Sequence, residues 1–255
     1  MSADLKMLES IQNTQSISRE ELDAILQTQD SFLIQELHKK AQQTATQIYG
    51  NKIYIRGLIE FTNYCKNNCY YCGIRNGNTK ADRYRLTTEQ ILSCCKTGWN
   101  LGFRTFVLQG GEDPYYTDVK ICQIVQEIKS KYPDCAITLS IGEKSEESYQ
   151  AYFNAGVDRY LLRHETADEE HYRKLHPQQM SLNNRKNCLK VLKKIGYQTG
   201  CGFMVGSPGQ TVDTLYQDLL FIKELKPEMV GIGPFIPHKD TPFANQPART
   251  LDLTL

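Results

Sequence analysis

The sequence lacks the features that mark several broad classes of protein. Thirty basic and twenty-nine acidic side chains leave a net charge of +1, so no excess of positive charge points to nucleic acid or to an anionic membrane surface. No apolar run approaches the length that spans a bilayer, and the N-terminus has no continuous apolar core of a secretory signal. We therefore expect a cytoplasmic protein that binds neither nucleic acid nor membrane.

The chain also lacks a Gly-x-Gly-x-x-Gly motif after an early strand. Such a motif is typical of doubly wound nucleotide-binding sheets, so its absence argues against that fold, which stays an alternative. Nine cysteines, an odd count without an export signal, favour a reducing compartment in which thiols serve metals or chemistry.

Three of these cysteines are closely spaced. Cys65, Cys69 and Cys72 fall within eight residues, and no fourth cysteine or histidine lies nearby. A structural zinc site and a fully ligated [4Fe–4S] cluster each take four protein ligands, whereas three thiolates leave one iron of a cluster open. We therefore predict an iron–sulfur cluster with a free iron for a chelating cofactor. A zinc-binding module without enzymatic activity is the alternative. We assign the other cysteines to packing: Cys94, Cys95, Cys122, Cys135, Cys188 and Cys201.

The apolar pattern predicts an α/β fold. Residues 1–50 have helical periodicity, with one helix opening at Ser18. Strands and helices then alternate, which indicates a parallel sheet with right-handed crossovers. We expect an N-terminal helical extension at 1–50 and a partial (β/α) TIM barrel of about six βα units at 51–255. The predicted strands are 53–61, 105–109, 136–141, 159–165, 198–205 and 229–236, and the helices between them are 88–101, 117–131, 145–155, 168–175, 182–195 and 211–225.

Each predicted strand ends in polar or glycine residues, and the carboxyl ends of barrel strands form active sites. The first strand ends in the cysteines, the second in Gln109-Gly110-Gly111-Glu112-Asp113, and the fourth in Arg163-His164-Glu165. For Gly110 and Gly111 the alternative is a plain βα turn at positive φ, and for the Arg163–Glu165 segment a structural ion pair. Arg185 on its own is typical of a surface helix cation.

Several motifs resemble a known family. The spacing Cys65-x3-Cys69-x2-Cys72, with Tyr71 before the last cysteine, resembles the signature of the radical S-adenosylmethionine (SAM) superfamily. Within it the chain resembles the HydE family of [FeFe]-hydrogenase maturases. The RHETA segment at 163–167 and the GIGPFIPH segment at 231–238 distinguish that family from biotin synthase and methylornithine synthase. Further matching stretches lie at 70–75, 83–87, 107–116, 158–167 and 204–211.

The resemblance implies a role for each matched position. Cys65, Cys69 and Cys72 would hold a [4Fe–4S] cluster whose fourth iron is open to the amino and carboxylate groups of SAM. The other SAM contacts would be Tyr71 and Met204 near the adenine, Gly110, Gly111 and Glu112 at the methionyl ammonium, and Ser140, Glu165 and Arg185 at the ribose and methionyl ends. The side chains facing the substrate would be Gln109, Thr138 and Arg163.

The family likeness implies reductive cleavage of SAM to a 5′-deoxyadenosyl radical, in maturation of the [FeFe]-hydrogenase active site. It implies a small-molecule or organometallic substrate and the maturases HydG and HydF as partners. Another radical SAM reaction, of the biotin synthase or methylornithine synthase group, is the alternative. Relatives of this family continue for about another hundred residues after the point that matches Leu255, so we expect a C-terminally truncated chain.

Overall fold

The computed structural model describes residues 3–248 and residue 254. By its internal contacts the chain divides into two compact units. One unit contains the residues up to Tyr54 together with Thr211–Tyr216, and the other contains Ile55–Gln210 and the described residues from Gln217 onward. No helix in this described part of the chain is long and apolar enough to cross a membrane.

The N-terminal residues form three helices, α1 (Ala3–Thr14), α2 (Arg19–Gln27) and α3 (Ser31–Tyr49). Ser18 caps α2, and Glu21 completes a capping box by accepting the Ser18 N–H, which satisfies two otherwise unpaired donors. Gly50 ends α3 with its N–H on the Thr46 carbonyl. The predicted helix start at Ser18 is therefore confirmed.

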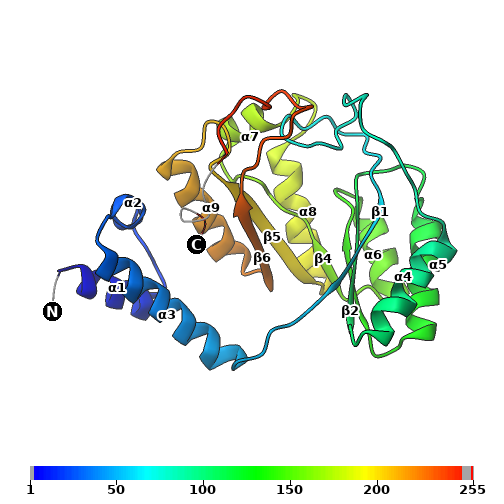
Figure 1. Cartoon of the computed structure of the whole chain (residues 1–255), viewed down its shortest axis with the longest axis horizontal. Helices are drawn as coiled ribbons and strands as arrows, with labels where there is room; N and C mark the ends of the chain where they lie inside the picture. The colour runs from blue at the N-terminus through cyan, green and yellow to red at the C-terminus, as the bar shows by residue number, and fades with distance from the viewer. Residues whose placement is uncertain (1–2, 249–253, 255) are drawn as a thin grey trace. The chain divides into compact units, whose positions relative to one another are not determined.

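The larger unit is built on six parallel strands that lie in the sheet in chain order (Figure 1). The strands are β1 (Gly57–Thr62), β2 (Thr105–Gly110), β3 (Ala136–Ser140), β4 (Arg159–Leu161), β5 (Gln198–Val205) and β6 (Met229–Pro234). The helices between them are α4 (Thr88–Asn100), α5 (Asp118–Lys131), α6 (Glu146–Ala155), α7 (Glu169–Leu175), α8 (Leu182–Ile195) and α9 (Val212–Leu225). Six βα units and a partial barrel are therefore confirmed.

Strands β1 and β4 are three or more residues shorter than the sequence predicts, and β3 and β6 end one and two residues early. The apolar residues Ile53, Tyr54 and Ile55 are at least 66% exposed and precede β1, which begins at Gly57. Strand β4 ends at Leu161, because the chain beyond it no longer pairs residue for residue with β5. An apolar run alone does not distinguish a paired strand from an unpaired extended segment.

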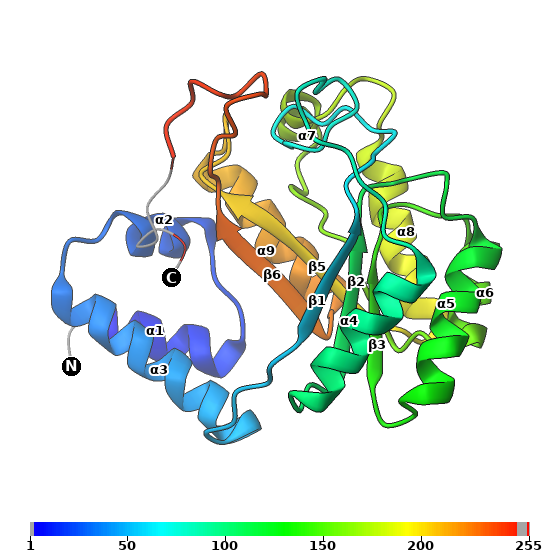
Figure 2. The ribbon, with the colours of Figure 1, turned by 45° about the vertical axis from the view of Figure 1, so that its right-hand side comes forward.

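One face of the sheet carries the hydrophobic core. The strand register places Ile59, Leu108, Leu139 and Tyr160 in one row, and all four are buried in a single apolar cluster. Helices α4, α5, α6 and α8 cover this face (Figure 2). Burial of each large side chain contributes roughly 1.5–3 kcal/mol, so this face fixes the strands in place.

The opposite face carries the polar residues, since successive strand side chains alternate. On this face Gln109 of β2 pairs with Glu60 of β1 and with Ser140 of β3. Thr138, two residues before Ser140 in β3, pairs with Val107 of β2. The loops that leave the carboxyl ends of the strands gather at one end of the sheet beside α7 (Figure 1). Strand geometry therefore brings the expected site residues Gln109, Thr138 and Ser140 to one face of the sheet.

Gly202 in β5 gives a test of how closely the strands approach. Its φ is +153°, and a Cβ there would lie 2.0 Å from the Gly231 carbonyl oxygen of β6. Backbone cannot yield to this clash, so we expect Gly202→Ala to lower the free energy of unfolding by about 3 kcal/mol. Gly233→Ala is the matched control, because nothing lies within 4 Å of its added methyl group. Equal urea denaturation midpoints for the two variants would contradict this account.

Candidate functional site

The loop that carries the cysteines is closed by one guanidinium group. Arg83 donates hydrogen bonds to four backbone carbonyls, those of Asn63, Ile74 at 2.9 Å, Arg75 at 2.7 Å and Asn78 at 3.2 Å. The fixed fork of five N–H donors suits arginine to such a role. The loop therefore has a defined shape without a regular element.

An ion pair between the buried Asp113 and the partly exposed Arg85 ties the segment after this loop to the end of β2. Arg85 donates to both carboxylate oxygens of Asp113, at 2.7 and 2.9 Å. Asp113 also accepts from the Thr62 hydroxyl at 2.7 Å and the Tyr115 N–H at 3.0 Å, while the Arg85 guanidinium lies 3.8 Å from the centre of the Tyr64 ring. Burial acts to raise the pKa of Asp113, but these donors outweigh it and the pKa is lowered.

Gly110 and Gly111 let the end of β2 approach the cysteine loop. A Cβ on Gly111 would lie 2.2 Å from the Tyr64 carbonyl oxygen and 2.6 Å from the Cys65 Cβ, and one on Gly110 would lie 2.7 Å from a Thr62 methyl group. Neither glycine has a positive φ. The alternative of a turn at positive φ is therefore wrong, and close packing against Thr62 and the cysteine loop requires both glycines.

Cys65, Cys69 and Cys72 are free thiols, each partly buried. Burial raises the pKa of all three, and Cys72 and Cys65 further raise that of Cys69, to about 12. The Cys69 sulfur lies 3.7 Å from the thioether sulfur of Met180. Among the residues that the structure describes, no three His, Cys, Asp or Glu side chains are arranged to hold a metal ion. The charges of Cys65 and Cys72 both act on Cys69, so the three thiols lie near one another on one loop.

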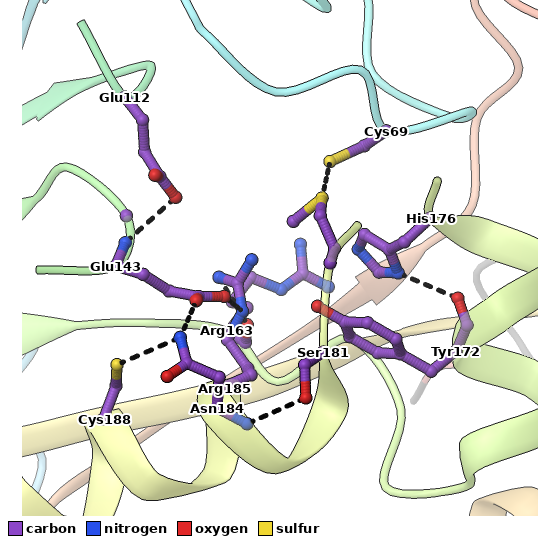
Figure 3. A network of polar contacts seen from close by, with 12 residues as sticks. Cys69, Glu112, Glu143, Arg163, Tyr172, His176, Ser181, Asn184, Arg185 and Cys188 are labelled. Atoms are coloured by element: carbon purple, nitrogen blue, oxygen red, sulfur yellow. Dashed lines mark hydrogen bonds and ion pairs between the residues drawn. The ribbon is translucent and has the colours of Figure 1, made fainter. Parts of the chain in front are cut away.

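Three charged side chains, two from the ends of β2 and β3 and one from helix α8, form a chain beside this loop (Figure 3). Glu112 accepts the Glu143 N–H at 2.9 Å and lies 3.2 Å from the Lys66 ammonium. Glu143 in turn lies 2.7 Å from the Arg185 Nε. Gly142, at φ +78°, leaves room for Glu112, since a Cβ there would lie 2.1 Å from the Glu112 Cγ.

Arg185 lies on α8 and is only 8% exposed, so the expectation of a surface helix cation is wrong. Burial acts to lower the pKa of Arg185, but the Glu143 carboxylate and other nearby anions outweigh it and the pKa is raised. A buried guanidinium is stable only when it is paired. Arg185 is therefore a permanent cation held inside the site.

Tyr71 is fixed by a buried histidine. The His176 Nδ1 lies 3.1 Å from the Tyr172 carbonyl oxygen, which can only accept, so Nδ1 carries the proton and Nε2 accepts from the Tyr71 hydroxyl at 3.3 Å. Burial lowers the pKa of His176 to about 3, which keeps the ring neutral. Tyr71 also packs against a small apolar cluster that contains Met204.

A cavity of about 650 Å³ opens beside the cysteine loop, and among the described residues Glu112 is the one expected site residue that lines it. Lys66 and Asn67 of the cysteine loop border it, together with Glu112, Glu143 and Met180. Its volume suits a ligand of nucleoside size. The charged lining contains both signs, so the cavity is suited to a polar ligand with separate anionic and cationic groups.

Other expected contact residues carry buried polar atoms without a hydrogen-bond partner in the described structure. These atoms are the Thr138 hydroxyl, the Arg163 Nε and Nη2, and the Glu165 Oε2, although Arg163 lies 3.7 Å from Glu165 as an ion pair. Leaving such groups unpaired costs about 1–3 kcal/mol each. Gln109 donates to Glu60 at 3.4 Å, and Ser140 lies beside it. The residues present thus fit a polar ligand at these strand ends.

Sequence reasoning missed Lys66, Arg83, Arg85, Glu143 and His176 as site residues. Most of these residues contact partners that are distant along the chain, so no rule of sequence spacing identifies them. The family resemblance at 83–87 includes Arg83 and Arg85 but gives neither a role. Cys94 is exposed, so its assignment to packing is wrong.

Comparisons with known proteins agree on one family. A family model described as the radical SAM superfamily matches residues 59–222. The [FeFe] hydrogenase maturase subunit HydE of Thermotoga maritima is 47% identical over 250 residues, which are 98% of this chain and 71% of that protein. The chain therefore spans about seven tenths of the length of this relative.

Solved structures show the same fold. The crystal structure of methylornithine synthase (PylB) matches with a TM-score of 0.87 and 28% identity, over 98% of this chain and 72% of that one. The hydrogenase maturase HydG matches with a TM-score of 0.82 and 23% identity, over 98% of this chain and 58% of that one. The likeness to HydG concerns the fold alone.

The Arg85–Asp113 pair gives a test of the loop attachment. We expect Asp113→Asn to lower the free energy of unfolding by about 2 kcal/mol at pH 7, because it leaves Arg85 unpaired. The folded-state pKa of Asp113 is lowered, so its contribution is complete above the unfolded value of about 3.9 and is lost as the pH falls through the folded value.

Urea unfolding of the two proteins between pH 7 and pH 2 measures this difference. Asp134→Asn is the control, because Asp134 lies at the same 2.7 Å from Arg104 but both side chains are about half exposed. An exposed pair contributes under about 1 kcal/mol. The difference in free energy of unfolding between wild type and Asp113→Asn should become smaller in acid. If it does not, the lowered pKa of Asp113 is contradicted.

Proposed function

Because the chain belongs to the radical SAM superfamily and within it to the HydE family of [FeFe]-hydrogenase maturases, we propose that it reductively cleaves SAM in maturation of the hydrogenase active site. The observation that supports this most directly is the cavity between the cysteine loop and the Glu112–Glu143–Arg185 chain. Its lining takes Lys66 and Asn67 from the cysteine loop together with Glu112 and Glu143, and Glu143 pairs with the buried Arg185.

The radical SAM family implies a [4Fe–4S] cluster and SAM. We assign Cys65, Cys69 and Cys72 as the three cluster ligands, with the fourth iron left to SAM. When bound and reduced, the cluster supplies the electron that cleaves SAM to methionine and a 5′-deoxyadenosyl radical. The protein contributes orientation and a water-poor site.

The charged chain suits the amino-acid end of SAM. Arg185 is a buried permanent cation that suits the methionyl carboxylate, and Glu112, with Gly110 and Gly111 beside it, suits the ammonium group. Glu143 holds both of these side chains. It is therefore a further positioning residue for the same end of the ligand.

The remaining contacts divide between nucleoside and substrate. Tyr71 and Met204 share one apolar cluster, which suits the adenine. Ser140 and Glu165 suit the ribose and the adjoining end of SAM. Gln109, Thr138 and Arg163 suit the substrate. The forked guanidinium of Arg163 suits a carboxylate group of that substrate.

We propose a small-molecule or organometallic substrate and HydG- and HydF-type maturases as partners, in the cytoplasm. The 47% identity to a HydE protein supports this pathway, whereas the likeness to methylornithine synthase is 28%. We also propose that residues 1–50 form a helical extension to a barrel core at 51–255.

Anaerobic reconstitution with iron and sulfide tests the enzyme class. We expect a brown protein that releases 5′-deoxyadenosine from SAM after reduction, measured by liquid chromatography, at a rate that rises with the proposed substrate. A colourless protein that retains zinc and cleaves no SAM would support the zinc-module alternative instead.

Cys69→Ala tests the ligand assignment. Two thiolates do not hold the cluster, so we expect iron and acid-labile sulfide to fall to background. Cys94→Ala is the control, because Cys94 is an exposed cysteine on α4, and it should keep the wild-type content. A normal cluster in Cys69→Ala would refute the assignment.

A further inference from the structure

Strands β4 and β5 lose their regular pairing immediately after Leu161. The Leu162 N–H donates to the Gly200 carbonyl at 2.9 Å, and the Glu165 N–H donates to the Gly202 carbonyl at 3.0 Å. Three residues on the β4 side therefore advance against two on the β5 side. The extra residue makes this a β-bulge, a feature that redirects side chains and is common beside active sites.

Glu165 lies at the end of this bulge in an unfavourable backbone conformation. Its φ is +66°, in the left-handed region that non-glycine residues seldom occupy. Such a conformation persists only where surrounding contacts hold it. The neighbouring contacts should therefore show what holds Glu165.

His164 fills the bulge and has a completely buried side chain. Its Nδ1 accepts the Gly202 N–H at 3.3 Å, so the ring replaces a ladder acceptor. The proton is then on Nε2, which lies 3.3 Å from the Asp218 carboxylate. The ring is further enclosed by Phe221, with ring centres 4.9 Å apart.

Asp218 on α9 holds the chain on both sides of Glu165. Its Oδ1 faces His164 and also accepts the Ala167 N–H at 2.5 Å. Asp218 is completely buried, as His164 is. The two side chains thus act on the backbone of residues 163–167 and have no direct access to a ligand.

We propose that His164 and Asp218 are a positioning pair that fixes Arg163 and Glu165 in the orientation that binds SAM and substrate. Arg163 and Glu165 form an ion pair at 3.7 Å, and their buried atoms make no hydrogen bond within the described structure, so a ligand can still satisfy them. This inference rests on the proposed function, because SAM is the ligand that Glu165 would contact. A pair that served packing alone would have no influence on SAM affinity.

The test compares the reconstituted wild type with His164→Ala and Asp218→Ala. We expect both variants to keep the iron and sulfide content of wild type. Their SAM dissociation constants should be at least tenfold higher, and their hydrogen–deuterium exchange at residues 165–167 should be faster. The SAM constant is measured from the shift of the reduced-cluster electron paramagnetic resonance spectrum. Exchange is measured without cluster or SAM and so reports on the pair alone.

Asp158→Ala is the matched control at the opposite end of β4. Asp158 accepts the Ile137 N–H at 2.7 Å and pairs with Lys129 at 2.8 Å, so its loss should reduce stability without changing SAM affinity. Two conservative variants divide the pair: His164→Asn keeps an acceptor for Gly202, and His164→Gln keeps a donor to Asp218. Each should give an intermediate SAM dissociation constant.

A SAM dissociation constant in His164→Ala equal to that of wild type overturns the proposal. If the alanine variants do not fold, an unchanged SAM dissociation constant in both His164→Asn and His164→Gln overturns it. Unchanged exchange at residues 165–167 also overturns it. Failure of wild type to cleave SAM contradicts the proposed function instead, and the exchange result still decides whether the pair holds the bulge.

Discussion

The site depends on the close approach of two strand ends. Where β2 ends, Gly111 lies so near the Tyr64 carbonyl and Cys65 that no side chain fits between them. This contact brings the cysteine loop over the end of the sheet, and the Arg85–Asp113 pair keeps it there. The neighbouring Glu112 then meets Lys66 from that loop and Glu143 from the next strand end.

The apolar and polar faces of the sheet perform different tasks. The row of Ile59, Leu108, Leu139 and Tyr160 under the helices supplies the favourable burial. That surplus offsets the cost of burying Arg185, Thr138 and the unpaired atoms of Glu165. Proteins commonly concentrate such unfavourable groups where a ligand will satisfy them.

Much of the fold follows from local patterns in the sequence. The capping boxes at Ser18 and Thr87 act within three residues, and strand–helix alternation fixes a parallel sheet, so both are predictable. The three-cysteine spacing likewise indicates the cluster chemistry that the family comparison supports. The strand ends themselves are less predictable, since β4 stops at Leu161, where an extra residue interrupts its pairing with β5.

The side chains that shape the site escape prediction because their partners are far apart in sequence. Asp218 pairs with His164 across more than fifty residues of sequence. Arg185 on α8 pairs with Glu143, which follows β3. Neither contact leaves a periodic or compositional signal. The sequence alone predicts a solvent-exposed arginine on this helix, because it does not show which carboxylate pairs with the side chain in the folded protein.

The lining of the cavity has a consequence for the rate at which ligands arrive. Lys66 and Lys144 stand beside Glu112 and Glu143, so positive and negative potentials largely cancel a short distance outside the opening. A ligand that carries charges of both signs is then oriented only after it enters, and its diffusional encounter gains little from long-range steering. Association should accordingly change little with ionic strength, in contrast to proteins whose clefts carry one sign of charge.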